Sequence, residues 1–298
     1  MSQAGLGGPA ARAIGTPAAP GRMARASLLG RANLGLAVGC LLLAVLVFCC
    51  LAAPLITSYG PAQQGPDVLA PPGAAHLFGT DQYGRDILSR TLYGGRIDLL
   101  IGVVLVGVAM TLGTVIGLVS GWFGGWTDTV IMRISDIGFA FPFLVLIICI
   151  VGLRGPGLTS LFLAVSMVAW IFYARLVRTE VLVLKDTNYI RSARLSDFST
   201  VRVLLRHVLP NVMGQVLVYA TSDFVYAVLL GASVSYLGLG VQPPASEWGA
   251  MVEQGQNFIT VQWWLSLFPG LAIIYLGLAF SLIGDGLADV MRTGDWSE

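Results

Sequence analysis

Long apolar runs constrain the fold of this chain more than any other feature. Each run is close to the ~20 residues that a helix needs to cross a bilayer, and only 11% of the 298 residues are charged while 56% are hydrophobic. Soluble domains carry about 25% charged residues, so we expect an all-α polytopic membrane protein. The runs predict six transmembrane helices, at about Leu34–Leu55, Leu99–Val119, Val130–Leu153, Leu158–Tyr173, Val212–Tyr236 and Trp263–Ile283.

The basic residues predict how these spans are oriented. The segment Arg175–Pro210 holds seven of the 17 Lys and Arg residues, namely Arg175, Arg178, Lys185, Arg191, Arg194, Arg202 and Arg206. If this segment is cytoplasmic, thirteen basic residues lie inside and four outside, as the positive-inside rule requires. Both termini are then cytoplasmic. A solvated basic loop that only sets topology is the simpler alternative.

The chain divides into five regions on this basis. Residues 1–33 are expected to be a disordered cytoplasmic tail because they are rich in Ala, Gly and Pro. The first span, 34–55, leads to an extracytoplasmic connection, 56–96, in which Asp86 and Arg90 stand four apart and predict a short interfacial helix. The remaining regions are a core, 97–289, with five spans and the loop 174–211, and a cytoplasmic tail, 290–298.

The basic segment itself breaks into short helices. Asp186 and Thr187 are N-cap candidates for a helix Asn188–Leu195, and the cluster around Ser199 can cap a second helix that stops before Pro210. A helix of about eight residues is marginal alone in water. The first of them therefore needs a surface to dock on.

Acidic residues within the spans are candidates for function. Asp223 lies inside the fifth span, where a charge costs about 3 kcal/mol on insertion scales. It is a candidate for a water-filled translocation pathway, although a shallow position near the interface or a partner's Arg would explain it equally well. Asp136, Asp285 and Asp289 are expected at interfaces.

Glycine and tryptophan residues give two further expectations, one for helix contacts and one for the lipid headgroup region. Gly113, Gly117 and Gly121 predict a face of small residues for close helix contact within the chain. Aromatic residues that suit the lipid headgroup region are Trp248, Trp263 and Trp264.

Several functional classes are not supported by any motif. The single lysine, Lys185, follows Val-Leu rather than a glycine-rich loop, and the four cysteines have no C-x-x-C spacing. Two isolated histidines do not suggest a metal site, and a net charge of +1 does not suggest nucleic acid. We expect neither a catalytic residue nor a metal in this chain, so ATP, if it drives the protein, binds another chain.

The loop sequence NYIRSARLSDFSTVRVLLRHVLPN, from Asn188 to Asn211, resembles that of binding-protein-dependent ABC importer permeases, whose pattern is Glu-Ala-Ala, three residues, Gly and a His-x-Leu-Pro ending. FGTDQYGRDILSR and YGGR, at 78–90 and 93–96, are similar to the dipeptide and oligopeptide group, on the side of the permease designated C. MRISDIGFAFP (132–142), SYLGLGVQPP (235–244) and Trp248-Gly249 fit the same group.

This resemblance implies a type I ABC importer permease fold in a bacterial cytoplasmic membrane, with a cytoplasmic coupling helix. The implied partners are a homologous second permease, two ATPase subunits that bind ATP and Mg, an extracytoplasmic substrate-binding protein and the bilayer. The implied cargo is dipeptides or short oligopeptides. The implied coupling residues are Arg191, Ser192, Ala193, Asp197, Arg202 and His207.

Three departures from the family pattern affect these expectations. Arg191 stands at the family's Glu, Asp197 at its Gly, and Gly231 at a Glu that usually precedes the Ser-Tyr-Leu-Gly match. The reversed charge at Arg191 suggests an ATPase with a compensating surface. Alternatives are a different cargo, such as nickel, glutathione or haem, an ion-coupled secondary transporter using Asp223 and Asp136, or a structural scaffold. The secondary transporter predicts broken helices, and none is evident in the sequence.

Overall fold

The computed structural model describes residues 22–195 and 198–294, and the regular structure within them is helical, with one isolated bridge between Thr80 and Asp86. The all-α prediction is confirmed. The helices are α1 (Arg22–Leu51), α2 (Ala53–Ile56), α3 (Ile87–Phe123), α4 (Gly125–Phe139), α5 (Phe143–Arg154), α6 (Leu158–Leu184), α7 (Asn188–Leu195), α8 (Thr200–Val203), a π-helical turn (Leu204–Val208), α9 (Leu209–Tyr236), α10 (Trp248–Gln256) and α11 (Trp264–Gly294).

Five helical stretches in the described part of the chain are long and apolar enough to cross a bilayer. They are α1, α3, α6, α11 and α9 with the turns that precede it. The pair α4 and α5 passes the same test and gives six spans if it is taken as one bent span. The expected six spans are reached when this pair is counted as one.

The third span is broken, although we expected a continuous helix at Val130–Leu153. The axes of α4 and α5 differ by 83° across the short connection between them. Pro142 is the N-cap of α5, with φ −58° and ψ 126°. Proline has no N–H for a helical hydrogen bond and disfavours helical backbone at the residue before it, Phe141. The expectation that the chain holds no broken helix was wrong.

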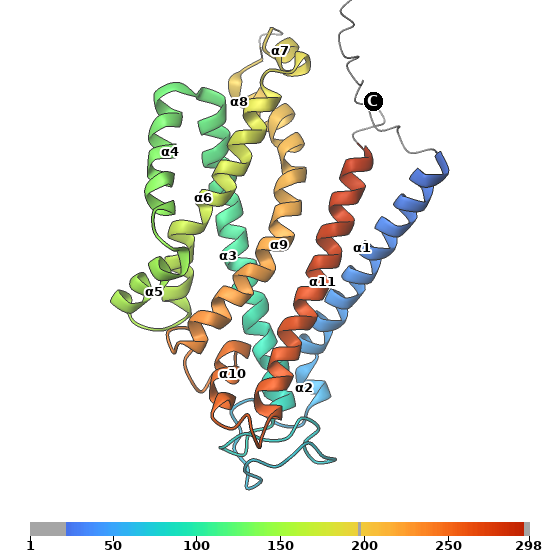
Figure 1. Ribbon diagram of the computed structural model, residues 1–298, viewed down its shortest axis with the longest axis vertical. Helices are drawn as coiled ribbons and strands as arrows, with labels where there is room; N and C mark the ends of the chain where they lie inside the picture. The colour runs from blue at the N-terminus through green and yellow to red at the C-terminus, as the bar shows by residue number, and fades with distance from the viewer. Residues whose placement is uncertain (1–21, 196–197, 295–298) are drawn as a thin grey trace, which may run out of the picture.

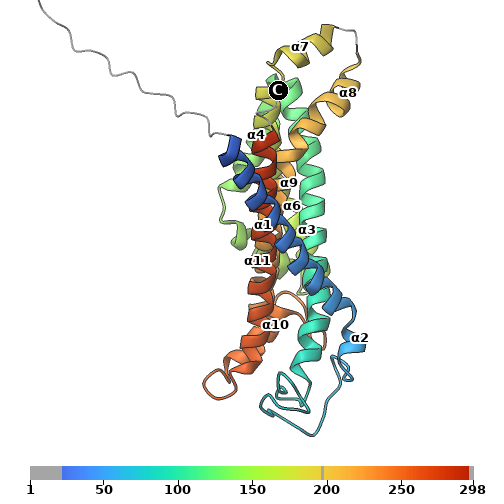
Figure 2. The same ribbon diagram turned by 90° about the vertical axis from the view of Figure 1, so that its right-hand side faces the viewer.

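The helices run between two opposite ends of the molecule. Helices α7 and α8 lie at one end, where α11 also finishes, and α2, α10 and residues 57–86 lie at the other (Figure 1). The same separation is seen from the side (Figure 2). We call these the α7 end and the α10 end. α1 starts toward the α7 end, so both ends of the described chain lie on that side, as the predicted topology requires.

Glycines allow α3 and α6 to pack closely. A Cβ placed on Gly117 would lie 2.6 Å from the carbonyl oxygen of Ala174, and one on Gly121 would lie 2.8 Å from Val181 Cβ. These distances are too short for any side chain. The face of small residues therefore serves packing within the chain, as predicted. Gly39 of α1 approaches Ala279 of α11 in the same way.

We expect Gly117→Ala to lower the thermal stability of the protein in detergent, whereas Gly107→Ala should not. Both residues are in α3, but a Cβ at Gly107 has no neighbour within 4 Å. The two variants gain the same helix propensity, so their difference isolates the steric cost, which we expect to be about 1–3 kcal/mol. Equal melting temperatures for the two variants would contradict the close approach of α3 and α6.

The tails differ partly from expectation. Residues 22–33 of the expected disordered tail belong to α1, and residues 290–294 of the expected C-terminal tail belong to α11. Residues 1–21 and 295–298 lie outside the described residues. The apolar spans thus extend as helices beyond the apolar runs themselves, because helical hydrogen bonds do not depend on hydrophobicity.

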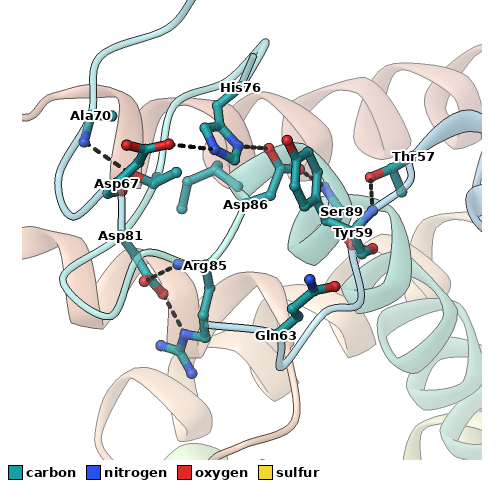
Figure 3. A network of polar contacts seen from close by, with 12 residues as sticks. Thr57, Tyr59, Gln63, Asp67, Ala70, His76, Asp81, Arg85, Asp86 and Ser89 are labelled. Carbon is teal, nitrogen blue, oxygen red and sulfur yellow. Dashed lines mark hydrogen bonds and ion pairs between the residues drawn. The ribbon is translucent and has the colours of Figure 1, made fainter. Parts of the chain in front are cut away.

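Residues 57–86 form a cap at the α10 end, held by buried polar contacts (Figure 3). The carboxylate of Asp81 accepts hydrogen bonds from the main-chain N–H groups of Tyr83, at 2.8 Å, and Arg85, at 2.9 Å, and from Arg85 Nε at 2.6 Å. Arg90 Nε lies 3.7 Å from the same carboxylate. Asp81, Arg85 and Arg90 are all buried. The cap therefore encloses two guanidinium groups around one carboxylate.

The interfacial helix predicted at Asp86 and Arg90 takes a different form. Residues 87–96 are the first turns of α3, and Asp86 is its N-cap, accepting a hydrogen bond from Ser89 N–H at 2.7 Å. His76 Nδ1 lies 2.9 Å from the other carboxylate oxygen of Asp86. Arg90 instead donates to Pro61 O at 3.1 Å. Asp86 and Arg90 therefore do not pair with each other, although they stand four residues apart. Each has a buried partner elsewhere in the cap, His76 for Asp86 and Asp81 for Arg90.

Two of the tryptophans expected at the headgroups are buried. Trp248 is fully enclosed, with its main-chain N–H 3.0 Å from Asp98 Oδ2 and its indole N–H 2.9 Å from Thr91 O. The indole N–H of Trp264 lies 3.3 Å from Thr80 O. Only Trp263 of the three is exposed. Glu247 caps α10 by accepting hydrogen bonds from Gly249 and Ala250. Trp248, Ala250 and Met251 are buried, so α10 packs as part of the core.

Candidate functional site

The loop between α6 and α9 forms the helix that the sequence predicts, α7, at Asn188–Leu195. Thr187 begins it: its carbonyl accepts from Arg191 N–H at 3.0 Å, and its hydroxyl lies 3.5 Å from Ile190 N. The other N-cap candidate, Asp186, instead lies 3.5 Å from Arg191 Nη2. Ser199 caps α8 by accepting from Arg202 N–H at 3.4 Å.

α7 is anchored to the membrane helices by its apolar face. Ile190 is completely buried and belongs to the main core cluster, together with Val181 at the end of α6. Arg194 places its guanidinium 4.1 Å from the ring centroid of Trp122, at the end of α3. Such a cation–π contact adds about 0.5–2 kcal/mol. The docking surface that this marginal helix needs is thus supplied in part by its own chain.

His207 connects α7 with the start of α9. It lies in the π-helical turn before Pro210, and its Nδ1 is 2.5 Å from the hydroxyl of Tyr189. The amide of Asn211 donates to the carbonyl of His207 at 2.6 Å. A proline without an N–H at position 210 interrupts the regular ladder here. His207 therefore contacts α7 through Tyr189 and the start of α9 through Asn211.

The other predicted coupling residues take different positions. Arg191, Ser192 and Arg202 are exposed, and Ala193 is buried beside Ile190 on the inner face of α7. Arg202 lies over the ring of Phe198 at 5.3 Å. Asp197 lies outside the described residues. Ala193 therefore contributes to anchoring rather than to an outward surface.

The outward surface of this loop also carries apolar side chains, which the sequence analysis did not identify. We call it the α7–α8 surface; its exposed apolar members are Tyr189 (55%), Leu195 (88%), Phe198 (40%), Val201 (64%) and Leu205 (58%). Arg191, Arg202 and Arg206 are exposed among them. Exposed apolar residues interspersed with arginine are typical of protein interfaces. They lie on α7, on α8, on the π-helical turn and, for Phe198, between α7 and α8, so they give no single periodic signal in the sequence.

Two ion pairs connect α4 with α6 near the same end. Arg178 donates to Asp128 through Nε, at 2.5 Å, and Nη2, at 2.6 Å, and Ser120 donates to the same carboxylate at 2.6 Å. Arg175 Nη2 lies 2.5 Å from Asp136 Oδ1. Asp136 is thus paired, as an interfacial position allows, while Asp285 and Asp289 are exposed on α11. These pairs join the broken span to the helix that leads into α7.

A cavity of about 300 Å³ lies among α3, α5, α6 and α9, and Asp223 lines it. Its walls include one residue of α5, Phe143, which the bend after α4 brings there. The remaining lining residues are Leu105, Val165, Ala169, Phe172, Tyr219, Ser222, Tyr226, Ala227 and Leu230. The structure therefore places Asp223 at a space between helices, and its role in a pathway stays a prediction.

Gly231, the third departure from the expected pattern, packs against α3. A Cβ at this position would lie 3.0 Å from Ile101 Cγ2. A larger side chain would need Ile101 to move, so the glycine suits the helix contact found here.

Comparisons with known proteins agree with this geometry. Residues 113–293 match the family model described as binding-protein-dependent transport system inner membrane component. The chain is 41% identical over 255 residues to a putative peptide transport system permease protein of Brucella suis biovar 1 (strain 1330), covering 85% of this chain and 86% of that protein. It is 42% identical over 220 residues to a glutathione transport system permease protein of Pectobacterium atrosepticum, covering 74% and 73%.

A solved structure gives the same fold. The chain resembles one from inward-facing conformations of the MetNI methionine ABC transporter with a TM-score of 0.51 and 18% identity, covering 66% of this chain and 94% of that one. At this identity the likeness concerns the fold alone.

Proposed function

Because the chain belongs to the family of binding-protein-dependent transport system inner membrane components, we propose that it imports dipeptides or short oligopeptides. It is a permease subunit of an ABC transporter and not an enzyme, and it crosses the membrane several times. The proposed cargo rests on relatives named for peptide transport. Glutathione, itself a short peptide, is the second candidate because a relative of similar identity is named for it.

The α7–α8 surface is the observation that carries the proposed mechanism. An eight-residue helix is held on its inner side by Ile190, while its outer side presents arginine and apolar groups. We assign this surface to an ATPase subunit that binds ATP and Mg. Closure of two such subunits would push α7, and His207 would pass the movement to α9. The spans would then alternate between inward- and outward-facing states.

The other proposed partners follow from the same architecture. A second, homologous permease would complete the pore, and an extracytoplasmic binding protein would deliver the solute at the α10 end. The α7 end would then face the cytoplasm of a bacterium, with both termini on that side. The distribution of basic residues supports this orientation, since positive loops stay inside.

We expect ATPase subunits to copurify with this chain from membranes in mild detergent and to be lost when Asn188–Leu195 is replaced by a Gly/Ser linker. The reason is that the linker removes both the anchored helix and its outward surface. ATP hydrolysis in the purified sample and uptake of labelled dialanine into proteoliposomes provide the measurements. A Gly/Ser replacement of residues 257–262, at the α10 end, is the control and should keep the ATPases.

An opposite result would identify another class of transporter. If the unmodified chain purified without ATPases and carried solute under an ion gradient, it would be a secondary transporter. The broken span α4–α5 would then be its characteristic feature. If labelled glutathione but not dialanine entered the vesicles, the transporter class would stand and the cargo would be corrected.

A further inference from the structure

Asp223 is an acidic residue in a membrane span that faces the cavity without a basic partner. Among the described residues its one hydrogen bond comes from Tyr173, whose hydroxyl donates to Asp223 Oδ2 at 2.9 Å. No Lys, Arg or His is among the residues that line the cavity. A carboxylate in a membrane helix is costly unless it is compensated. This position is therefore suited to a cation that arrives from outside the chain.

Aromatic rings line the same cavity as Asp223. Tyr219 and Tyr226 stand on the same helix, α9, and Phe143 and Phe172 reach the cavity from α5 and α6. The Phe143 and Phe172 rings meet edge to face at 5.6 Å, and Phe143 lies 6.2 Å from Tyr226. Ring faces attract organic cations, and a carboxylate beside them adds a full counter-charge. The arrangement suits an ammonium group better than a hydrated metal ion.

Tyr173 holds the carboxylate in place. Its side chain is buried and packs edge to face on Tyr219 at 4.9 Å. Gly113 lets α3 pack closely against the backbone side of Tyr173, since a Cβ there would overlap Tyr173 Cβ. Tyr173 is thus a positioning residue, because it orients one oxygen of Asp223 and leaves the other for a ligand.

We propose that this cavity binds the ammonium group of the transported solute, with Asp223 as its counter-ion and the rings of Phe143, Phe172, Tyr219 and Tyr226 around it. The inference rests on the proposed function, in which a peptide with a free amino terminus passes through the pore. A volume of about 300 Å³ is at the small end of ligand pockets, so it accommodates one end of a peptide. A single carboxylate gives a weak site, which lets the solute leave again.

The first test measures the charge preference of the cavity without any transport. In the assembled complex, with Cys40, Cys49, Cys50 and Cys149 replaced by alanine, Ser222→Cys introduces one thiol into the cavity wall. Cationic methanethiosulfonate-ethyltrimethylammonium and anionic methanethiosulfonate-ethylsulfonate then compete for it. We expect the cationic reagent to react at least ~10-fold faster, relative to their rates with free thiol, because a charged cleft concentrates its counter-ions.

Asp223→Asn is the matched variant and should bring the two relative rates together. Equal rates in the cavity that retains Asp223 would overturn the proposal, because they would mean that Asp223 gives the cavity no net negative charge. A cationic preference that survives Asp223→Asn would overturn it as well, since the charge would then come from elsewhere.

The second test measures uptake of labelled dialanine into proteoliposomes. We expect Asp223→Asn to lower the maximal rate about tenfold, the loss of one hydrogen bond to a charged group, with the affinity of the binding protein for dialanine unchanged. Asp223→Glu should recover part of the rate, and Tyr173→Phe should lower it less than Asp223→Asn. An unchanged rate in Asp223→Asn would refute the ammonium site while leaving peptide import intact. If the unmodified complex did not transport dialanine but the cationic preference held, the peptide proposal would fail and the cation site would stand.

Discussion

Ile190→Asp is expected to abolish coupled transport while leaving the membrane helices folded. Ile190 is the anchor of α7, completely buried against the ends of the spans. An ionised carboxylate placed there loses several kcal/mol of solvation, so α7 no longer packs against the membrane helices. Because about 1.4 kcal/mol changes an equilibrium tenfold, we expect dialanine uptake to fall at least tenfold. ATP hydrolysis should no longer respond to the loaded binding protein.

The measurement is ATP hydrolysis and uptake in the same proteoliposomes, with and without the binding protein. Ile190→Val is the control, since it removes one methyl group at a cost of about 0.5–1.5 kcal/mol and should keep most of the coupling. The thermal stability of the permease in detergent provides a check that the spans remain folded. Full uptake by Ile190→Asp would contradict this prediction, because it would show that transport does not need the packing of α7 against the membrane helices.

Asp81→Ala is expected to unfold the cap at the α10 end. The substitution leaves the guanidinium groups of Arg85 and Arg90 buried without the carboxylate that lies 2.6 and 3.7 Å from them. It also removes the acceptor of two main-chain N–H groups. Breaking a buried ion pair on one side costs about 3–5 kcal/mol. We expect a lower melting temperature in detergent and faster proteolysis within residues 57–86.

Asp67→Ala is the matched control in the same segment. Its carboxylate is 60% exposed and lies 3.7 Å from His76 Nε2, and exposed pairs contribute about 0–1 kcal/mol. Its carbonyl, which accepts a hydrogen bond from Thr80, is kept in the variant. If Asp81→Ala and Asp67→Ala melted at the same temperature, the buried ion cluster would not hold the cap together.

Local patterns determined a large part of this protein from the sequence alone. The spans follow from apolar length, and the small-residue face of α3 follows from glycine spacing. The helix at Asn188–Leu195 follows from the N-cap candidates before it, whereas the burial of Ala193, which was expected among the coupling residues, was found only in the structure. Each of these features depends on residues within a few turns of each other. The family resemblance in the same loop also depends on local sequence, and the comparisons bear it out.

The tertiary structure alone decided how distant residues combine. Trp248 and Trp264 were expected in the lipid headgroup region but lie in the core, because Asp98, Thr91 and Thr80 supply partners for their N–H groups. Asp86 and Arg90 have the spacing of an ion pair, yet each found a buried partner in the cap. The rings that line the cavity with Asp223 come from α5, α6 and α9, and the bend at Pro142 determines that Phe143 joins them. Sequence spacing describes a single helix, whereas a cavity is formed where several helices meet, and their packing sets which side chains share it.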